Sequence, residues 1–273
     1  MLYEAIQFLT TPCSSAARKL GYLSQAIALE ARYKRCRFGW SLHLKNSQEL
    51  IREAIAQCPG QRKAVVLGSG LLLDIPIEDL SADFEQVDLI DIVHLRAARR
   101  RVQKFHNVHL IETDITGVVQ ELARLKGTMT GYTDAGPPEK SWPQPYCDDQ
   151  LFEGADLVIS ANILSQLPLL PEEYLTSLGC ENSKAIDKYG RSIINHHLKL
   201  LKHLDCMVCF IADVERCILS KPKPSKNENL LYGVKPLIAA HSWMWNIAPA
   251  PEVDRMTHVH HRVVGGIIPP GKE

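Results

Sequence analysis

Short, mostly apolar runs alternate with longer amphipathic segments from residue 63 onward. Each run ends at or near a glycine, a serine or an aspartate; the five runs span residues 64–67, 87–90, 108–111, 157–159 and 206–212. Runs of this kind are typical of strands in a parallel sheet that is covered on both faces. Segments with helical spacing separate them, over residues 93–105, 117–126 and 183–204. The alternation predicts a doubly wound α/β fold.

Two further strands are predicted near the C-terminus, at residues 242–248 and 259–268. The connection between them contains Pro249 and Pro251 and shows no helical pattern. Consecutive strands without a crossover helix pair antiparallel. We therefore expect a mostly parallel, seven-stranded sheet that ends in an antiparallel C-terminal hairpin.

The first sixty residues show helical spacing and no strand pattern. One helix is predicted over residues 16–31, and a second is predicted to begin at Ser47 and to end at Pro59. We expect a helical N-terminal unit over residues 1–60 and an α/β unit over residues 61–273.

Two segments of the α/β unit interrupt the alternation of predicted strands and helices. Residues 127–150 are rich in glycine, proline and aspartate, which predicts a long surface insertion. Residues 220–229 contain two prolines among lysines and asparagines, which predicts an exposed loop.

The composition narrows the classes of partner. The chain has 31 basic and 31 acidic residues and a formal net charge of zero, so no general attraction to nucleic acid or to an anionic membrane is expected. No apolar run approaches the roughly 20 residues that a membrane span needs. The N-terminus lacks a basic run, and the 8 cysteines are scattered, so we expect reduced thiols in the cytoplasm. The oligomeric state stays open.

A glycine turn follows the first predicted strand, at Gly68, Ser69 and Gly70. Glycine lets the backbone approach a ligand closely, and a helix is expected to begin near residues 72–74. Asp91 ends the next strand, where a carboxylate can accept hydrogen bonds from the hydroxyls of a ribose. Asp114 follows the third strand, where it can bind an adenine amino group. The alternatives are a plain strand-to-helix turn and helix N-caps for both aspartates.

Four segments together resemble the class I S-adenosylmethionine-dependent methyltransferases. The segments read VVLGSGLLLD, VDLIDIV, LIETDIT and DLVISANILSQL, and the resemblance runs from about Lys63 to Ile268. The closing hairpin is similar to the reversed seventh strand of that Rossmann-like fold. The resemblance implies S-adenosylmethionine as cofactor, and as cofactor contacts it implies Gly68, Ser69, Gly70, Asp91, Ile92, Asp114, Ile115 and Asn162.

The sequence departs from the family pattern at two positions of the first motif. The family has an acid two residues before the first glycine, where it orients the methionine amino group, and this chain has Val66 there. The third small residue of the glycine loop is replaced by Leu72. The resemblance therefore implies that Asn162 or backbone carbonyls hold the ammonium of the cofactor.

The N-terminal helices resemble the lid that many small-molecule methyltransferases place over the site. Trp40 and His43 are three residues apart on one helix face, and we expect them to contact the substrate. The alternative is that Trp40 packs in the core and that His43 lies on the surface. Asp213, at the end of the fifth predicted strand, and His43 are the candidate catalytic residues. An ion pair with Arg216 or with a lysine is the alternative for Asp213.

No metal site is expected. His258 and His260 share one face of a predicted strand, but two histidines without a further ligand do not form a zinc site.

The predicted function is a methyl transfer from S-adenosylmethionine to a small molecule. Such a transfer requires mainly alignment and exclusion of water, so no catalytic residue needs to stand out. A non-catalytic binding protein of the same fold is the first alternative. A nicotinamide-dependent oxidoreductase is the second, and Leu73, in place of the third glycine of a dinucleotide-binding turn, argues against it.

Overall fold

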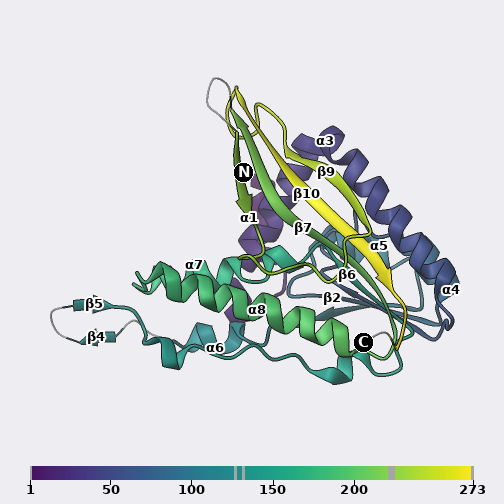
Figure 1. The fold of residues 1–273 in the computed structure, drawn as a ribbon, viewed down its shortest axis with the longest axis horizontal. Coiled ribbons are helices and arrows are strands. Elements are labelled where there is room, and N and C mark those ends of the chain that lie inside the picture. The colour runs from purple at the N-terminus through teal and green to yellow at the C-terminus, as the bar shows by residue number, and fades with distance from the viewer. Residues whose placement is uncertain (1, 126–127, 131–132, 221–224, 272–273) are drawn as a thin grey trace.

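The computed structural model describes residues 2–125, 128–130, 133–220 and 225–271. Its main sheet has eight strands, with seven in the order β3-β2-β1-β6-β7-β10-β9 and β8 paired to β7 (Figure 1). The bounds are β1 Lys63–Leu67, β2 Gln86–Asp91, β3 Val108–Glu112, β6 Leu157–Ala161, β7 Met207–Ser220, β8 Lys226–Asn229, β9 His241–Ala248 and β10 Thr257–Ile268. The doubly wound fold with its antiparallel C-terminal hairpin is confirmed, and β8 is an additional strand.

Helices cover both faces of the sheet. They are α1 Leu2–Thr10, α2 Ser15–Lys19, α3 Tyr22–Gln57, α4 Ile77–Asp83, α5 Arg96–Val102, α6 Val119–Arg124, α7 Leu169–Ser177 and α8 Ser183–His203. In β1, Val65 and Leu67 pack with α6, α7 and α8, whereas Ala64 and Val66 pack with α3, α4 and α5. Alternate residues of one strand thus enter two different cores, which is why the strand is apolar throughout.

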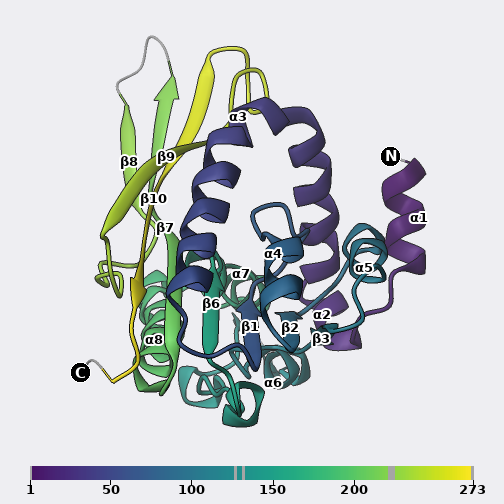
Figure 2. The same ribbon diagram turned by 90° about the vertical axis from the view of Figure 1, so that its right-hand side faces the viewer.

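Helix α3 is continuous over 36 residues, so the predicted break before Ser47 is wrong. The buried residues Cys36, Trp40, His43 and Ser47 continue a single stripe through the segment between the two predicted helices. Figure 2 shows α3 as an arch whose two arms descend toward the sheet. None of the helices in the described ranges is both long and apolar enough to cross a membrane.

Two predicted surface segments are more ordered than expected. Within residues 127–150, Trp142 and Cys147 are buried, and Trp142 packs edge-on against Tyr189 at 5.4 Å. The short strands β4 Thr128–Thr130 and β5 Thr133–Ala135 form a separate two-stranded sheet. The predicted loop at residues 220–229 contains β8, which pairs antiparallel with β7. Residues 127, 131–132 and 221–224 of these two segments lie outside the described ranges.

Candidate functional site

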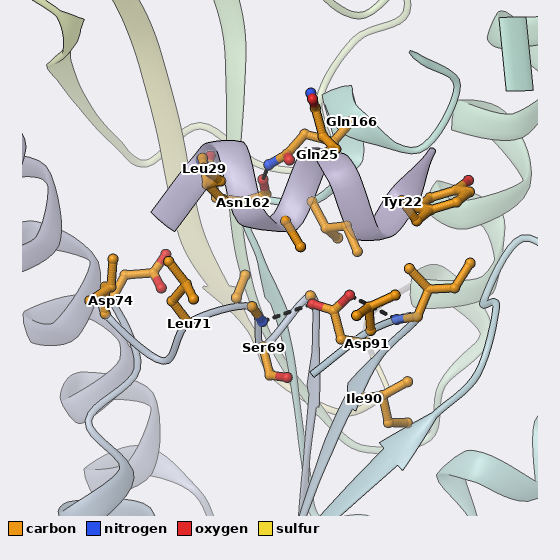
Figure 3. Close-up of a pocket in the computed structure, with 18 of the residues that line it drawn as sticks. Tyr22, Gln25, Leu29, Ser69, Leu71, Asp74, Ile90, Asp91, Asn162 and Gln166 are labelled. Atoms are coloured by element: carbon orange, nitrogen blue, oxygen red, sulfur yellow. Dashed lines mark hydrogen bonds between the residues drawn. The ribbon is translucent and has the colours of Figure 1, made fainter. Parts of the chain in front are cut away.

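A pocket lies at the carboxyl ends of β1, β2, β3 and β6, and α3 crosses over it (Figure 3). Strand order reverses at β1, because β2 pairs with one edge of β1 and β6 with the other. In an open α/β sheet this position is where ligands bind. The arch of α3 contributes Tyr22 and Gln25 from its first arm and Trp40 and His43 from its second.

The glycine turn forms one wall of the pocket. Gly68 and Gly70 have φ of 79° and 49°, a region that favours glycine. A Cβ on Gly68 would lie 2.7 Å from Cβ of Ile163, so the turn must remain bare on that side. The amides of Gly68 and Ser69 both donate to the carbonyl of Ile90, at 2.9 and 3.2 Å, which ties the turn to β2.

The helix expected at residues 72–74 begins later, at Ile77. Leu72 and Ile75 are fully buried and anchor an irregular loop ahead of it. Leu72 has φ of 61°, which is unusual for a residue with a side chain. The helix N-terminus is therefore not adjacent to the glycine turn, and the loop lines the pocket instead.

Asp91 points at the glycine turn. Its Oδ2 accepts from the amide of Gly70 at 2.8 Å, and its Oδ1 accepts from the amide of Ile92 at 2.7 Å (Figure 3). Burial raises the pKa of Asp91, and these amides oppose that effect. Each carboxylate oxygen can accept a further hydrogen bond, so the side chain is able to bind a ligand hydroxyl while it holds the turn.

Asp114 has the geometry of a cap. Its carboxylate accepts from the amides of Thr116 and Val119, both at 2.8 Å, and from the hydroxyl of Thr116 at 2.5 Å. It therefore stabilises the turn that leads into α6, but Asp114 is not the N-cap of that helix, which is Val118. Asp114 and the adjacent Ile115 also line the pocket.

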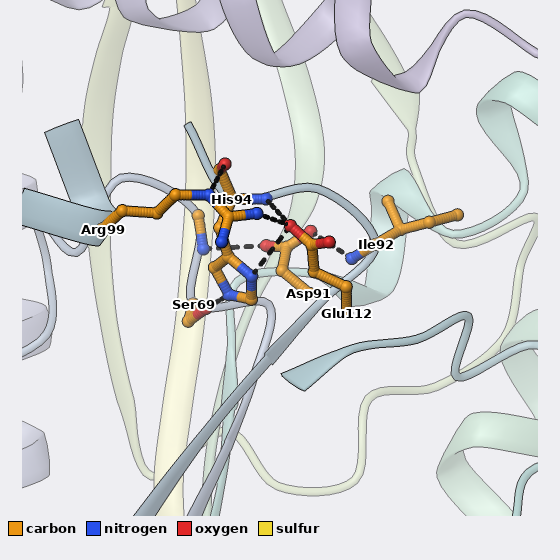
Figure 4. Close-up of polar contacts among 7 residues, drawn as sticks. Ser69, Asp91, Ile92, His94, Arg99 and Glu112 are labelled. Carbon is orange, nitrogen blue, oxygen red and sulfur yellow. Dashed lines mark hydrogen bonds and ion pairs between the residues drawn. The ribbon is translucent and has the colours of Figure 1, made fainter. Parts of the chain in front are cut away.

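A polar network that the sequence did not reveal supports the turn from below (Figure 4). Ser69 Oγ lies 3.0 Å from Nε2 of the fully buried His94. Burial and the nearby Arg99 lower the pKa of His94 to about 4, so the ring is neutral. Arg99 pairs with Glu112 and donates from Nε to the carbonyl of His94. The sequence does not show this network, because Ser69 follows β1, His94 follows β2 and Glu112 ends β3, and these residues meet only in the folded sheet.

Asn162 lines the pocket and has an unsatisfied side-chain acceptor. Its backbone adopts φ of 52°, its amide donates to the carbonyl of Ile211, and its own carbonyl accepts from Gln166 Nε2 at 2.8 Å. The side-chain Oδ1 is buried and has no hydrogen-bond partner among the described residues. A buried acceptor without a donor is unfavourable, and a ligand that donates a hydrogen bond relieves it.

The second arm of α3 and β9 form an aromatic wall. His43 stacks on Trp245 with ring centroids 4.1 Å apart and an angle of 12° between the ring planes. Trp40 meets Trp245 edge-on at 4.9 Å and donates from Nε1 to the carbonyl of Ile247 at 2.9 Å. Trp40 thus packs, as the alternative proposed, and also lines the pocket. His43 is buried, so its alternative placement on the surface is wrong.

The tautomer of His43 follows from its partner. Trp243 Nε1 lies 3.1 Å from His43 Nδ1, and an indole N–H can only donate. Burial lowers the pKa of His43 to about 4, so the ring is neutral near pH 7. Nδ1 is therefore the acceptor and Nε2 carries the proton, which makes His43 a hydrogen-bond donor toward the pocket that it lines.

Asp213 is not among the described residues that line the pocket. It lies within β7 rather than at the end of a strand, because β10 and β8 pair with the extension of β7 beyond it. Its carboxylate accepts from Ser165 Oγ and from His261 Nδ1, the latter at 2.7 Å. Arg216 pairs with Glu228 and Asp213 pairs with His261, so the ion pair between Asp213 and Arg216 that was the alternative is not formed.

Asp74 is a pocket residue that was not singled out from the sequence. It follows the glycine turn on the irregular loop and lies at the opposite end of the pocket from Tyr22 (Figure 3). Burial raises the pKa of Asp74 from 3.8 to about 6. The sequence shows it only as a polar residue after three leucines.

No protein-family profile and no curated protein matches the chain. Solved structures similar to it include the N-methyltransferase NodS from Bradyrhizobium japonicum WM9 in complex with S-adenosyl-L-homocysteine, 13% identical, covering 81% of this chain and 85% of that one, with a TM-score of 0.33. Another is a 1,6-didemethyltoxoflavin-N1-methyltransferase from Burkholderia thailandensis, 12% identical, covering 93% and 92%, with a TM-score of 0.35. A third is DhpI in complex with SAH, 12% identical, covering 91% and 97%, with a TM-score of 0.36.

The strand order and the reversed β10 between β7 and β9 identify the fold as Rossmann-like, of the class I methyltransferase type.

Proposed function

We propose that this chain is an S-adenosylmethionine-dependent methyltransferase that acts on a small molecule. The observation that carries the proposal is the placement of Asp91 against the bare turn of Gly68 and Gly70, at the carboxyl ends of neighbouring strands. This arrangement offers acceptors for the two hydroxyls of a ribose, next to backbone that can approach the nucleoside closely.

The residues of the pocket suit the parts of the cofactor. Ile92 and Ile115 offer apolar surface for the adenine ring, and Asn162 offers an unpaired acceptor for an ammonium. The absence of a Cβ on Gly68 lets the turn pack closely against Ile163, which also lines the pocket. When bound, the cofactor supplies an electrophilic methyl group.

The substrate is proposed to bind against the aromatic wall of the pocket. Trp40 and His43 lie there, and Trp245 extends the apolar surface that a flat substrate needs. The Nε2–H of His43 donates to a carbonyl or oxyanion of the substrate and so orients its nucleophile. His43 does not act as a base in this arrangement, because Trp243 already donates to Nδ1. The protein's contribution is alignment and exclusion of water under the arch of α3.

Isothermal titration calorimetry with S-adenosylmethionine and S-adenosylhomocysteine tests the proposal. Both ligands are expected to bind the wild-type protein, and NAD⁺ is expected to give no heat. Asp91→Ala removes both ribose contacts, so the affinity should fall at least about tenfold, given about 1.5–3 kcal/mol for a hydrogen bond to a charged group. Asp83→Asn is the matched control, because Asp83 is exposed on α4 and away from the pocket.

Asp91→Ala also leaves the amides of Gly70 and Ile92 without their acceptor, so circular dichroism must confirm that the variant is folded. Absence of heat from folded wild-type protein with millimolar S-adenosylmethionine would contradict the proposed function and favour a non-catalytic protein of this fold.

A further inference from the structure

The pocket is acidic. Three carboxylates line it, from Asp74, Asp91 and Asp114, and no lysine or arginine lines it within the described part of the chain. The other titratable side chains that line it are neutral near pH 7, because burial holds the pKa of His43 at about 4 and that of Tyr22 well above its usual value. Such a lining favours a ligand that carries positive charge.

The three carboxylates are not equivalent. Asp91 accepts from the amides of Gly70 and Ile92, and Asp114 accepts from those of Thr116 and Val119. Asp74 forms no ion pair and no hydrogen bond with another side chain in the described ranges, and its own backbone amide is the group that opposes its burial. Asp74 is therefore the pocket carboxylate that lacks a partner.

A second unpartnered acceptor lines the same pocket. Asn162 is 4% exposed, and its Oδ1 has no donor in the described structure. In Figure 3, Asn162 lies above the glycine turn, with Asp74 on the left of the view and Tyr22 on the right. Val66, which precedes the turn, is fully buried in the core under α3 and offers no acceptor to a ligand. Among the side chains that line the pocket, Asp74 is thus a carboxylate without a charged partner and Asn162 has a buried acceptor without a donor.

We propose that Asp74 and Asn162 receive a primary ammonium group, which in the proposed cofactor is the ammonium of the methionine part. This inference rests on the proposed function and deepens it. An ammonium carries three N–H donors and one positive charge, so it supplies both the charge that Asp74 lacks and the donor that Asn162 Oδ1 lacks. Asp74 thereby takes the place of an acid ahead of the turn, at a position eight residues later in the chain.

The proposal predicts a pH dependence of binding. The titratable groups that share the pocket with Asp74 are Tyr22 and His43 of α3, Asp91 at the end of β2 and Asp114 after β3. Burial raises the pKa of Asp74 to about 6, so its carboxyl is charged above that pH and becomes protonated as the pH falls below it. An ammonium binds the charged form, so affinity is expected to weaken as the pH is lowered through 6.

Calorimetry with two ligands separates this contact from the rest of the site. S-adenosylhomocysteine carries the amino-acid part, and 5′-methylthioadenosine has the same adenosine and sulfur without it. Asp74→Asn keeps the shape of the side chain. It should lower the affinity for S-adenosylhomocysteine by about 10- to 100-fold and change the affinity for 5′-methylthioadenosine by no more than about twofold. In Asn162→Gly, the glycine tolerates the positive φ and Oδ1 is removed. This variant should lower the affinity for S-adenosylhomocysteine by a smaller factor than Asp74→Asn does, and should leave the affinity for 5′-methylthioadenosine unchanged.

The pH series supplies an independent readout. Wild-type affinity for S-adenosylhomocysteine should fall several-fold from pH 7.5 to pH 5, while the affinity for 5′-methylthioadenosine stays level and Asp74→Asn shows no such fall. The exposed Asp83→Asn variant serves as control and should match the wild type.

The outcomes separate the two proposals. If the wild-type protein binds neither ligand, both are overturned. If it binds both and Asp74→Asn leaves the affinity for S-adenosylhomocysteine unchanged, or lowers the affinities for both ligands equally, the ammonium site is overturned and the proposed function stands.

Discussion

At the scale of single residues, the pocket holds a carboxyl group in a place that is unfavourable for its charge. Asp74 is half-buried against the loop and α3, and burial raises its pKa from 3.8 to about 6. The folded protein therefore holds a proton on Asp74 over a pH range in which the unfolded chain has released it. The contribution of Asp74 to stability is largest below pH 4 and is lost as the pH rises through 6.

This direction of the pH dependence predicts how Asp74→Asn changes the stability of the ligand-free protein. At pH 7 the variant should be more stable than the wild type, by an amount on the order of 1–3 kcal/mol, because the pKa difference sets an upper limit of about 3 kcal/mol. Near pH 4 the two proteins should be equally stable. Urea unfolding at pH 4.5, 6 and 7.5 measures the difference. If the free energies of unfolding of the two proteins changed in parallel with pH, burial would not disfavour the charged form of Asp74.

The residues of the glycine turn were accessible from the sequence, and the residues that complete the site were not. Gly68, Gly70 and Asp91 follow from strand ends and a spacing of about 20 residues. The environment of Asp74 arises only when the arch of α3 covers the loop, and His94 meets Ser69 from a different strand end. A linear pattern carries no information on such contacts.

At the scale of elements, the arch of α3 is held closed by β9 and the turn after it. Trp40 donates to the carbonyl of Ile247, and His43 accepts from Trp243. Arg35 pairs with Glu252 beyond the end of β9, through Nε at 2.9 Å and a second nitrogen at 2.6 Å. These contacts position the second arm of α3 over the pocket.

Gly39 allows this close approach. A Cβ on Gly39 would lie 2.9 Å from the carbonyl oxygen of Asn246, which is closer than real Cβ contacts come. In an exposed helix, glycine to alanine stabilises by about 1 kcal/mol. We predict the opposite sign for Gly39→Ala, a loss of about 1–3 kcal/mol together with weaker binding of S-adenosylhomocysteine, because α3 must move away from β9.

Thermal unfolding and calorimetry measure both effects. Ser41→Ala, at an exposed position of the same helix, should change stability by no more than about 0.5 kcal/mol. A Gly39→Ala variant more stable than the wild type would contradict the close contact.

The elements with a strong hydrophobic period were predicted, and those shaped by tertiary contacts were not. The buried strands and α8 follow their patterns. The middle of α3 is rich in charge and its buried stripe includes Cys36, His43 and Ser47, which hides the helical period. β8 reads Lys-Asn-Glu-Asn and is a strand because it pairs with the extension of β7.

At the scale of the whole molecule, the topology places the proposed cofactor contacts from the strand ends at one edge of the sheet. β1 lies between β2 and β6, so the glycine turn, Asp91 and Asn162 emerge side by side from strands that are far apart in sequence. The α/β alternation predicted this edge, and the antiparallel β10 and β9 extend the sheet to the aromatic wall. The central claim is that this edge binds an adenosyl group.

The crystal structure of the protein with S-adenosylhomocysteine tests that claim most directly. The account predicts the ribose hydroxyls within hydrogen-bond distance of the Asp91 carboxylate and the adenine ring between Ile92 and Ile115. An adenosyl group bound elsewhere, or one whose ribose makes no contact with Asp91, would contradict it.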